Sequence, residues 1–224
     1  MKQVLVRGGN IVIEQVPAPI ARESAVVVRT SYSIISSGTE LSAVESSSDT
    51  VFDRIRKKPE LIRKGIASVR EHGLLQTYRT AKGDEGLGQA LGYSLSGVVT
   101  AVGSGIADLS VGDPVACAGA GLANHAEQVC VPRNLIVTIP DGVAMNDAAS
   151  VTLGAIAMQG IRQAAPLLGE WVVVTGLGLL GLLTVQMLRA NGCRVVGIDP
   201  DENRRRLASE LGADFCYAPS EEQL

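Results

Sequence analysis

Three glycines at G-x-G-x-x-G spacing, Gly176, Gly178 and Gly181, follow the five-residue apolar run Trp171–Thr175. The run is typical of a buried parallel strand, and an apolar helix pattern follows over residues 179–188. In this arrangement the first glycine permits a tight turn, and the second lets a pyrophosphate approach the backbone. The third glycine lets the helix pack closely on the strand. The segment therefore predicts a dinucleotide-binding turn between a strand and a helix.

The start of that helix is the predicted phosphate site. Its first turn holds Leu179 and Leu180, and the free N–H groups and positive dipole end of a helix N-terminus attract phosphate. A second strand, residues 194–198, ends at Asp199, 18 residues after Gly181. A carboxylate there can accept both ribose hydroxyls of NAD. A strand, a glycine triplet, a helix, a strand and an acid in this order are more specific than the triplet alone.

Three arginines, Arg204, Arg205 and Arg206, follow Asp199 closely. One of them, Arg204 being our candidate, could stack on the adenine or reach a 2′-phosphate. Because Asp199 would repel that phosphate, we expect NAD(H) to be preferred over NADP(H). The alternative is that the arginines form a solvated basic face of the second helix.

The composition excludes several other classes of function. The chain has 224 residues, of which 46% are hydrophobic and 19% charged, with a formal net charge of −3 and 3% aromatic residues. It has no basic field for nucleic acid or an anionic membrane, and few aromatic platforms for stacking. Its four cysteines form no C-x-x-C pair. The apolar run at its N-terminus is too short for the hydrophobic region of a signal segment. Its longest apolar stretch, residues 177–183, is far shorter than a membrane span. We expect a cytoplasmic protein with reduced thiols.

The remaining chain predicts a β-rich first domain. We expect a domain over residues 1–145 with a helical insertion at about 40–90, and a second domain over 146–224 that begins with a linker helix. The strands are expected at residues 4–6, 11–13, 25–31, 94–102, 126–131 and 135–139, and the linker helix at 147–165. The basic run at 54–58 is either a solvated face or a contact for a phosphate or partner.

The second domain contains one half of the usual dinucleotide-binding sheet. After Asp199 the sequence predicts a helix over 201–211 and a third strand over 214–217. A doubly wound dinucleotide-binding domain has two such halves. We therefore expect the chain to be a fragment of a longer protein. A further alternative is that the incomplete sheet leaves the chain inert and its edge prone to pairing.

Four further segments resemble the medium-chain dehydrogenase/reductase superfamily, of the zinc alcohol dehydrogenase type. Residues 37–40 (Ser-Gly-Thr-Glu) stand where that family has Cys-Gly-Thr-Asp, and residues 92–99 where it has Gly-His-Glu and a Gly-Val-Val strand. Residues 111–115 resemble its Gly-Asp-Arg-Val turn, and residues 123–132 its Tyr-Ala-Glu and Val-Pro run. The resemblance implies an α/β protein with a GroES-like β-barrel followed by a truncated Rossmann domain, and hydride transfer with a nicotinamide cofactor.

The departures from that family concern its zinc ions. Its catalytic Cys, His and Cys ligands correspond to Ser37, Tyr93 and Ala155, and none of these is a good zinc ligand. The four-cysteine lobe of the structural zinc is also missing, so we expect no zinc. An alternative metal cluster of Cys117, His125 and Glu127 can be written, although a satisfied or exposed histidine is the more common arrangement.

Within the superfamily, the chain is similar to a zinc-less branch of bi-domain oxidoreductases. Their sequences share the helical insertion, Gly-Tyr-Ser in place of Gly-His-Glu, and a run like residues 117–127. In that branch a second, sugar-dehydrogenase-like domain often follows, and some members resemble proteins of surface polysaccharide synthesis. The resemblance thus implies a sugar-derived substrate and a fused second oxidoreductase domain in the full-length protein.

Without zinc, hydrogen bonds or a proton donor must polarise a carbonyl. Thr39 stands at the family's proton-relay hydroxyl and Tyr93 in its cleft, so each is a candidate to donate or relay a proton. The alternatives are a turn-stabilising hydroxyl for Thr39 and an aromatic plug for Tyr93. Gln159 could touch the cofactor amide or lie on a helix surface. Glu40 matches the family's acid next to the metal ligands, and without metal it could only cap a helix.

The sequence thus predicts a zinc-independent oxidoreductase acting on a small molecule, a carbonyl, an alcohol or an activated C=C, with NAD(H). The alternative is a non-catalytic nucleotide- or partner-binding module that lost its chemistry with the zinc. The substrate and the oligomeric state stay open, a homo-oligomer being one alternative.

Overall fold

The structure is a computed structural model that describes residues 1–36, 38–41, 44 and 88–219. Contacts within it divide the chain into two compact units, Met1–Ala149 (unit 1) and Ser150–Leu224 (unit 2). The predicted helical insertion, the basic run at 54–58 and Ser37 lie wholly or almost wholly outside the described residues. Residues 38–41 are helical.

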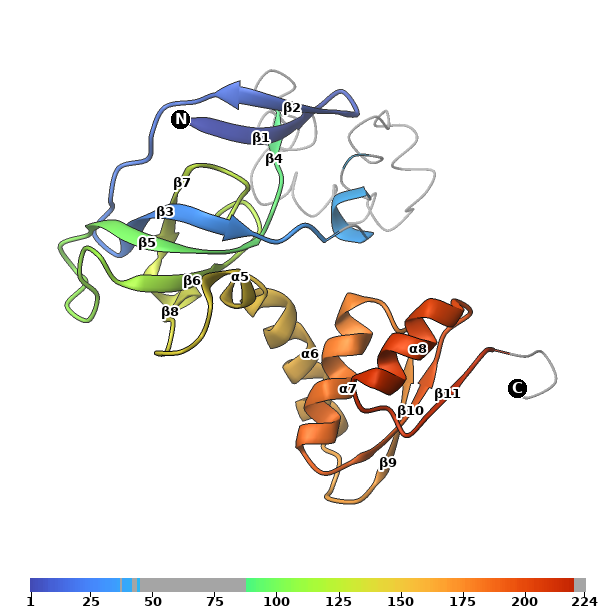
Figure 1. Ribbon diagram of the computed structural model, residues 1–224. Helices are drawn as coiled ribbons and strands as arrows, with labels where there is room; N and C mark the ends of the chain where they lie inside the picture. Colours follow the sequence, from blue (N-terminus) through green and yellow to red (C-terminus); the bar gives the residue numbers. More distant parts are fainter. Residues whose placement is uncertain (37, 42–43, 45–87, 220–224) are drawn as a thin grey trace, which may run out of the picture. The chain divides into compact units, whose positions relative to one another are not determined.

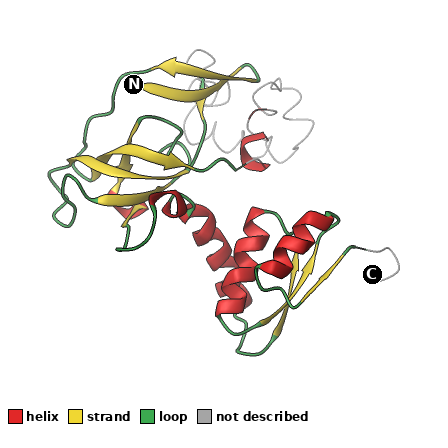
Figure 2. Cartoon of the chain, in the orientation of Figure 1, coloured by secondary structure: helices red, strands yellow, loops and turns green. Residues whose placement is uncertain are grey.

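The described residues of unit 1 form two antiparallel sheets (Figures 1 and 2). The five-stranded sheet has the order β7-β3-β5-β6-β8 and the three-stranded sheet the order β2-β1-β4. The strands are β1 (Lys2–Arg7), β2 (Asn10–Gln15), β3 (Ala25–Ser33), β4 (Gln89–Ala90), β5 (Ser94–Val102), β6 (Pro114–Ala118), β7 (Gln128–Pro132) and β8 (Ile136–Thr138). A 3-10 turn, η1 (Arg133–Leu135), joins β7 to β8, and β8 is followed by the short helix α5 (Met145–Ala148).

The core of unit 1 lies against β3 and β5, the two central strands of the larger sheet. β-Branched residues dominate these strands, and such side chains pack well on a pleated surface. Val26, Val28, Leu95 and Val99 are all at most 1% exposed and belong to one buried cluster. The five-stranded sheet therefore forms a firm support for the segments that leave its ends.

Helix α5 is attached to the larger sheet by two buried hydroxyl groups of β5. Ser94 Oγ donates to the carbonyl of Ala149 at 2.6 Å, and Ser96 Oγ donates to the carbonyl of Met145. Both serines are fully buried. These bonds supply partners for polar groups that burial would otherwise leave unsatisfied.

The linker helix expected over 147–165 is wrong in one respect, because the structure divides it into α5 and α6 (Val151–Ala164). α6 ends where Ala165 adopts a left-handed backbone with φ of 46°. Pro166 comes next and cannot continue a helix.

Unit 2 contains a three-stranded parallel sheet of order β11-β10-β9 with helices against it (Figure 1). Its elements after α6 are β9 (Trp171–Thr175), α7 (Leu179–Ala190), β10 (Arg194–Ile198), α8 (Glu202–Glu210) and β11 (Phe215–Tyr217). One buried cluster joins the sheet to α7 and α8, and includes Leu177, Val185, Leu188, Val195 and Ala208. The alternation of strands and helices expected from the glycine motif is thus present, and the predicted α/β fold class is confirmed.

The prediction that Trp171–Thr175 is a buried strand is wrong for one of its faces. Trp171 and Val173 are 51% and 58% exposed, whereas Val174 is buried. The ring of Trp171 stacks on Phe215 at 5.7 Å, Phe215 stacks on Tyr217 at 6.4 Å, and the guanidinium of Arg194 lies 5.3 Å from the Trp171 ring. A parallel sheet is buried only when helices cover both faces, and α7 and α8 pack on the other face.

Among the residues that the structure describes, no helix is long and apolar enough to cross a membrane.

Candidate functional site

The glycine-rich turn of unit 2 has the geometry that its sequence predicts. Gly176 has a φ of +86°, a left-handed conformation that favours glycine, and its N–H donates to the carbonyl of Ile198 at 2.8 Å. A Cβ atom on Gly181 would lie 1.9 Å from the carbonyl oxygen of Gly176. Only a glycine at 181 therefore allows α7 to start this close to the end of β9.

Gly178 plays a different part in the same turn. It is the residue before α7, it has an ordinary φ of −71°, and it caps the helix with no side chain. A Cβ atom added to Gly178 would meet nothing within 4 Å. The space beside Gly178 is thus open, next to the first-turn N–H groups of Leu179 and Leu180, which a helix leaves without an internal acceptor. This arrangement fits a bound pyrophosphate.

Asp199 is the acid that follows the second strand of the motif, and it is only 3% exposed. Its Oδ2 accepts the N–H of Leu177 at 2.7 Å, and its Oδ1 accepts the N–H of Asp201 at 2.8 Å. These two hydrogen bonds, with the nearby charges of Arg204 and Arg205, hold the pKa of Asp199 below its ordinary value. The carboxylate is therefore ionised and tied to the glycine-rich turn itself. Each of its oxygens keeps a second lone pair for a ribose hydroxyl.

The three arginines of α8 separate into different environments. Arg204 Nη1 lies 3.8 Å from Asp199 Oδ2. Arg205 donates instead to the carbonyls of Asp199 and Pro200, at 2.7 and 2.8 Å. Arg206 is exposed and pairs weakly with a glutamate one turn later. Arg204 is thus the arginine whose guanidinium lies beside the carboxylate of Asp199.

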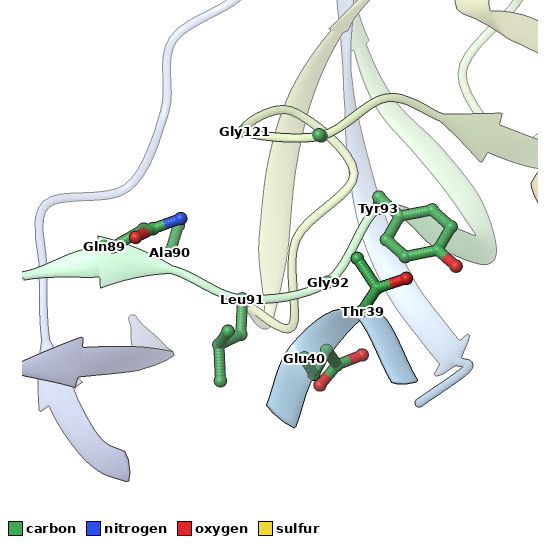
Figure 3. Close-up of a pocket in the computed structure, with 9 residues that line it drawn as sticks. Thr39, Glu40, Gln89, Ala90, Leu91, Gly92, Tyr93 and Gly121 are labelled. Carbon is green, nitrogen blue, oxygen red and sulfur yellow. The ribbon is translucent and has the colours of Figure 1, made fainter. Parts of the chain in front are cut away.

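Unit 1 contains a pocket of about 200 Å³ that brings together both predicted proton-transfer residues. Thr39, Glu40 and Tyr93 line it, with the remaining wall formed by Gln89, Ala90, Leu91, Gly92, Ala120 and Gly121. In Figure 3, Thr39 and Glu40 project from one helical turn, and the Thr39 hydroxyl points to the side of the Tyr93 ring. A hydroxyl, a carboxylate and a phenol therefore face one partly apolar cavity.

Behind this pocket lies a hydrogen-bonded chain that the sequence did not predict. His125 Nε2 lies 3.2 Å from both carboxylate oxygens of Glu40, and His125 Nδ1 lies 2.8 Å from Ser33 Oγ. The side chains of His125 and Glu40 are 10% and 12% exposed. One indication was available in the sequence, because Glu40 matches the acid next to the metal ligands in the family that the chain resembles, and the sequence contains two histidines in total.

The alternative metal cluster of Cys117, His125 and Glu127 is wrong. His125 pairs with Glu40 and Ser33, and Glu127 accepts the backbone N–H of Lys2 at 2.8 Å. Cys117 is fully buried, which raises the pKa of its thiol to about 12 and keeps it protonated. Within the described part of the chain, no three His, Cys, Asp or Glu side chains are placed to hold a metal ion.

The position of the third zinc ligand, Ala155, and the candidate contact for the cofactor amide, Gln159, both lie in α6. Ala155 and Gln159 are both exposed residues of this helix in unit 2. Among the described residues that line the pocket, Glu40 is the one of a type that zinc prefers, and its carboxylate already has an imidazole partner. The side chains that the structure describes around the pocket therefore do not form the donor set of a zinc site.

Comparison with known proteins shows which dehydrogenases and oxidoreductases this chain is similar to. A model of the zinc-binding dehydrogenase family matches residues 180–224. The D-guloside 3-dehydrogenase of Escherichia coli K12 is 34% identical over 130 residues, which are 58% of this chain and 37% of that enzyme. A quinone oxidoreductase of Pseudomonas aeruginosa is 33% identical over 131 residues, which are 57% of this chain and 40% of that protein.

The fold has close counterparts among solved structures. The galactitol-1-phosphate dehydrogenase of Escherichia coli superposes with a TM-score of 0.76 and 22% identity, over 100% of this chain and 62% of that one. The chain spans less than half the length of the curated relatives named above. The strand–glycine turn–helix geometry, the matched segments and the shared fold agree, and all are similar to dehydrogenases and oxidoreductases of the zinc-binding dehydrogenase type.

Proposed function

We propose that the chain is part of a zinc-independent oxidoreductase that transfers hydride between NAD(H) and a small, sugar-derived carbonyl or alcohol. The observation that carries this proposal is the glycine-rich turn, where Gly181 permits close packing and Gly178 leaves open space beside a helix N-terminus. The buried, ionised Asp199 completes a site for a dinucleotide. Bound there, the dinucleotide supplies the hydride chemistry, and the protein supplies binding and orientation.

The preference for NAD(H) follows from the charge next to the predicted ribose site. Asp199 is ionised and would repel a 2′-phosphate, whereas its free lone pairs suit ribose hydroxyls. Arg204 is the nearest cation to that carboxylate, and it is 56% exposed. A solvated arginine paired with an acid offsets that repulsion only in part.

The activation of a carbonyl without zinc is assigned to the pocket of unit 1. Thr39 and Tyr93 both line it, and a hydroxyl or phenol aimed at a carbonyl oxygen can donate a hydrogen bond or a proton. A sugar-derived substrate is supported by the similarity to a D-guloside 3-dehydrogenase. The hydroxyls of such a substrate also suit a pocket with polar groups among apolar ones.

The first experiment is a titration of the chain with NADH and, separately, with NADPH. Trp171 is the single tryptophan, so energy transfer from its emission to the dihydronicotinamide reports binding. We expect saturable transfer with NADH and weaker binding of NADPH. Equal affinity for both would contradict the role of Asp199, and binding of neither by this chain or by a longer version would contradict a dinucleotide site.

The second experiment tests catalysis. NAD⁺ reduction is followed with a panel of polyols and methyl glycosides, including a methyl guloside and galactitol. Turnover of any member supports an oxidoreductase. NADH binding without turnover of the whole panel would instead favour the alternative, a nucleotide-binding module without catalysis.

A further inference from the structure

Glu40 is held at the wall of the unit 1 pocket by bonds from two directions. Its Oε1 accepts the N–H of Ser36 at 3.0 Å, and the N–H of Glu40 donates to the carbonyl of Ser36 at 2.9 Å. Both carboxylate oxygens also lie 3.2 Å from His125 Nε2. The carboxylate is thus fixed in position while it faces a cavity.

The imidazole of His125 lies directly behind the pocket wall at Gly92. Gly92 has a φ of +91°, and a Cβ atom there would lie 2.9 Å from His125 Nδ1. The backbone of His125 is fixed as well, because its N–H donates to Leu91 and its carbonyl accepts from Val4, both at 2.8 Å. The glycine therefore makes room for the ring at this place, and the ring contacts two pocket-lining residues, Gly92 and Glu40.

The hydrogen bonds of this chain of groups are complete with either form of the imidazole. With a neutral imidazole, Nε2–H donates to Glu40 and the Ser33 hydroxyl donates to Nδ1, at 2.8 Å. With a charged imidazole, both ring nitrogens donate, and the Ser33 hydroxyl rotates to accept. In both cases Nε2–H donates to the Glu40 carboxylate, so the imidazole orients that carboxylate.

We propose that Glu40 is the general base and acid of the unit 1 pocket, with His125 and Ser33 as positioning residues that hold its carboxylate in place. The inference rests on the oxidoreductase function proposed above. During alcohol oxidation the carbinol C–H bond breaks, and its hydrogen leaves with both electrons to an oxidised nicotinamide dinucleotide. The O–H bond breaks as its proton passes to the Glu40 carboxylate, and the electron pair of that bond becomes the second C=O bond. Reduction reverses each transfer.

The test compares Glu40→Gln with Glu127→Gln. The amide keeps the size of Glu40 and can still accept from Ser36, but it cannot take up a proton. Glu127 is a matched control, because its carboxylate also accepts a backbone N–H, from Lys2, in the same unit and lies outside the pocket lining. Kinetics use the polyol or methyl glycoside that the wild-type chain, or the longer protein, oxidises fastest.

We expect Glu40→Gln to lower kcat by about 100-fold, within the range for general acid–base catalysis, with an unchanged Kd for NADH. Glu127→Gln should stay within about twofold of wild type. In Glu40→Ala, added formate should restore part of the lost rate, because it supplies the missing carboxylate. Equal kcat in Glu40→Gln and Glu127→Gln would overturn this inference and leave the proposed oxidoreductase function standing. A folded Glu40→Ala that formate does not rescue would have the same meaning.

A readout without turnover uses the ring nitrogens of His125. His72→Asn leaves His125 as the single histidine, so its ¹⁵N resonances are assigned directly. We expect Glu40→Gln, and not Glu127→Gln, to shift the Nε2 resonance, and Ser33→Ala to shift Nδ1. An Nε2 resonance insensitive to Glu40→Gln would overturn the pairing. NADH binding without turnover of the whole panel would overturn the oxidoreductase function, and this inference with it.

Discussion

A methyl group added at Gly178 should weaken NADH binding, whereas one added at Gly181 should lower the stability of the protein. In Gly178→Ala the new Cβ meets nothing within 4 Å and the φ of −71° suits alanine. The unfolding free energy should therefore change by less than about 1 kcal/mol, because alanine restricts the unfolded chain but is a poorer N-cap than glycine. The methyl group would, however, occupy the space that we assign to the pyrophosphate. We expect the Kd for NADH to rise at least tenfold, which is about 1.4 kcal/mol.

In Gly181→Ala the same atom lies 1.9 Å from the carbonyl oxygen of Gly176, against 3.4 Å or more for ordinary contact. The carbonyl is a backbone group and the Cβ atom is bonded directly to the backbone, so neither can turn aside and α7 must move away from β9. Overpacking of this kind costs about 3 kcal/mol. Urea unfolding followed by Trp171 emission measures stability, and energy transfer to NADH measures binding.

The expected result is thus a stable Gly178→Ala that binds NADH poorly and a destabilised Gly181→Ala. A matched control is Gly160→Ala, in an exposed part of α6 with nothing within 4 Å of its Cβ. It should gain about 1 kcal/mol of stability and keep its NADH affinity. A Gly178→Ala protein with wild-type affinity would refute the placement of the pyrophosphate, and an undisturbed Gly181→Ala would refute the packing argument.

Three further predictions concern buried polar and thiol groups. Asp199→Asn removes one acceptor for the N–H groups of Leu177 and Asp201, so it should lower the free energy of unfolding by about 1–3 kcal/mol at pH 7 and weaken the preference for NADH. Because the pKa of Asp199 is lowered from 3.8, urea titrations should show this difference above about pH 4, and it should be lost as the pH falls through the lowered pKa. The pKa of Cys117 is raised to about 12 by burial, so a disulfide reagent at pH 8 should label it, by mass spectrometry, only as the chain unfolds. Ser94→Ala removes the donor to the Ala149 carbonyl. It should lower the free energy of unfolding by about 1–2 kcal/mol, which thermal unfolding would show as a lower Tm.

The sequence predicted best the elements that are defined by local pattern. β5, β9 and β10 have the residue bounds that their β-branched runs predict, because each run ends at a glycine, an aspartate or a turn. β4 was not predicted. It has two residues and exists because it pairs with β1, more than 80 residues earlier in the chain. Its own sequence carries no strand pattern.

The sites divide in the same way. The glycine turn and Asp199 were predicted because one strand–helix–strand unit contains them, and the unit imposes their spacing. The contact between Glu40 and His125 joins residues 85 positions apart, so no periodicity or spacing indicates it. The burial of Trp171 and Val173 was overestimated because an apolar run shows what a strand can bury, and not whether a second layer covers it.

The stacked rings of Trp171, Phe215 and Tyr217 form an aromatic row on the exposed face of the unit 2 sheet, and Trp171 is a fluorescent probe within it. Trp171 begins β9 and the glycine turn follows its end, so about 16 Å of strand separates the indole from the predicted phosphate site. The wavelength of Trp171 emission responds to whatever covers the row, whereas energy transfer responds to the nucleotide. A blue shift without energy transfer would mark the covering of the sheet by protein, and energy transfer without a blue shift would mark the nucleotide. One tryptophan can thus follow assembly and ligand binding as two separate events.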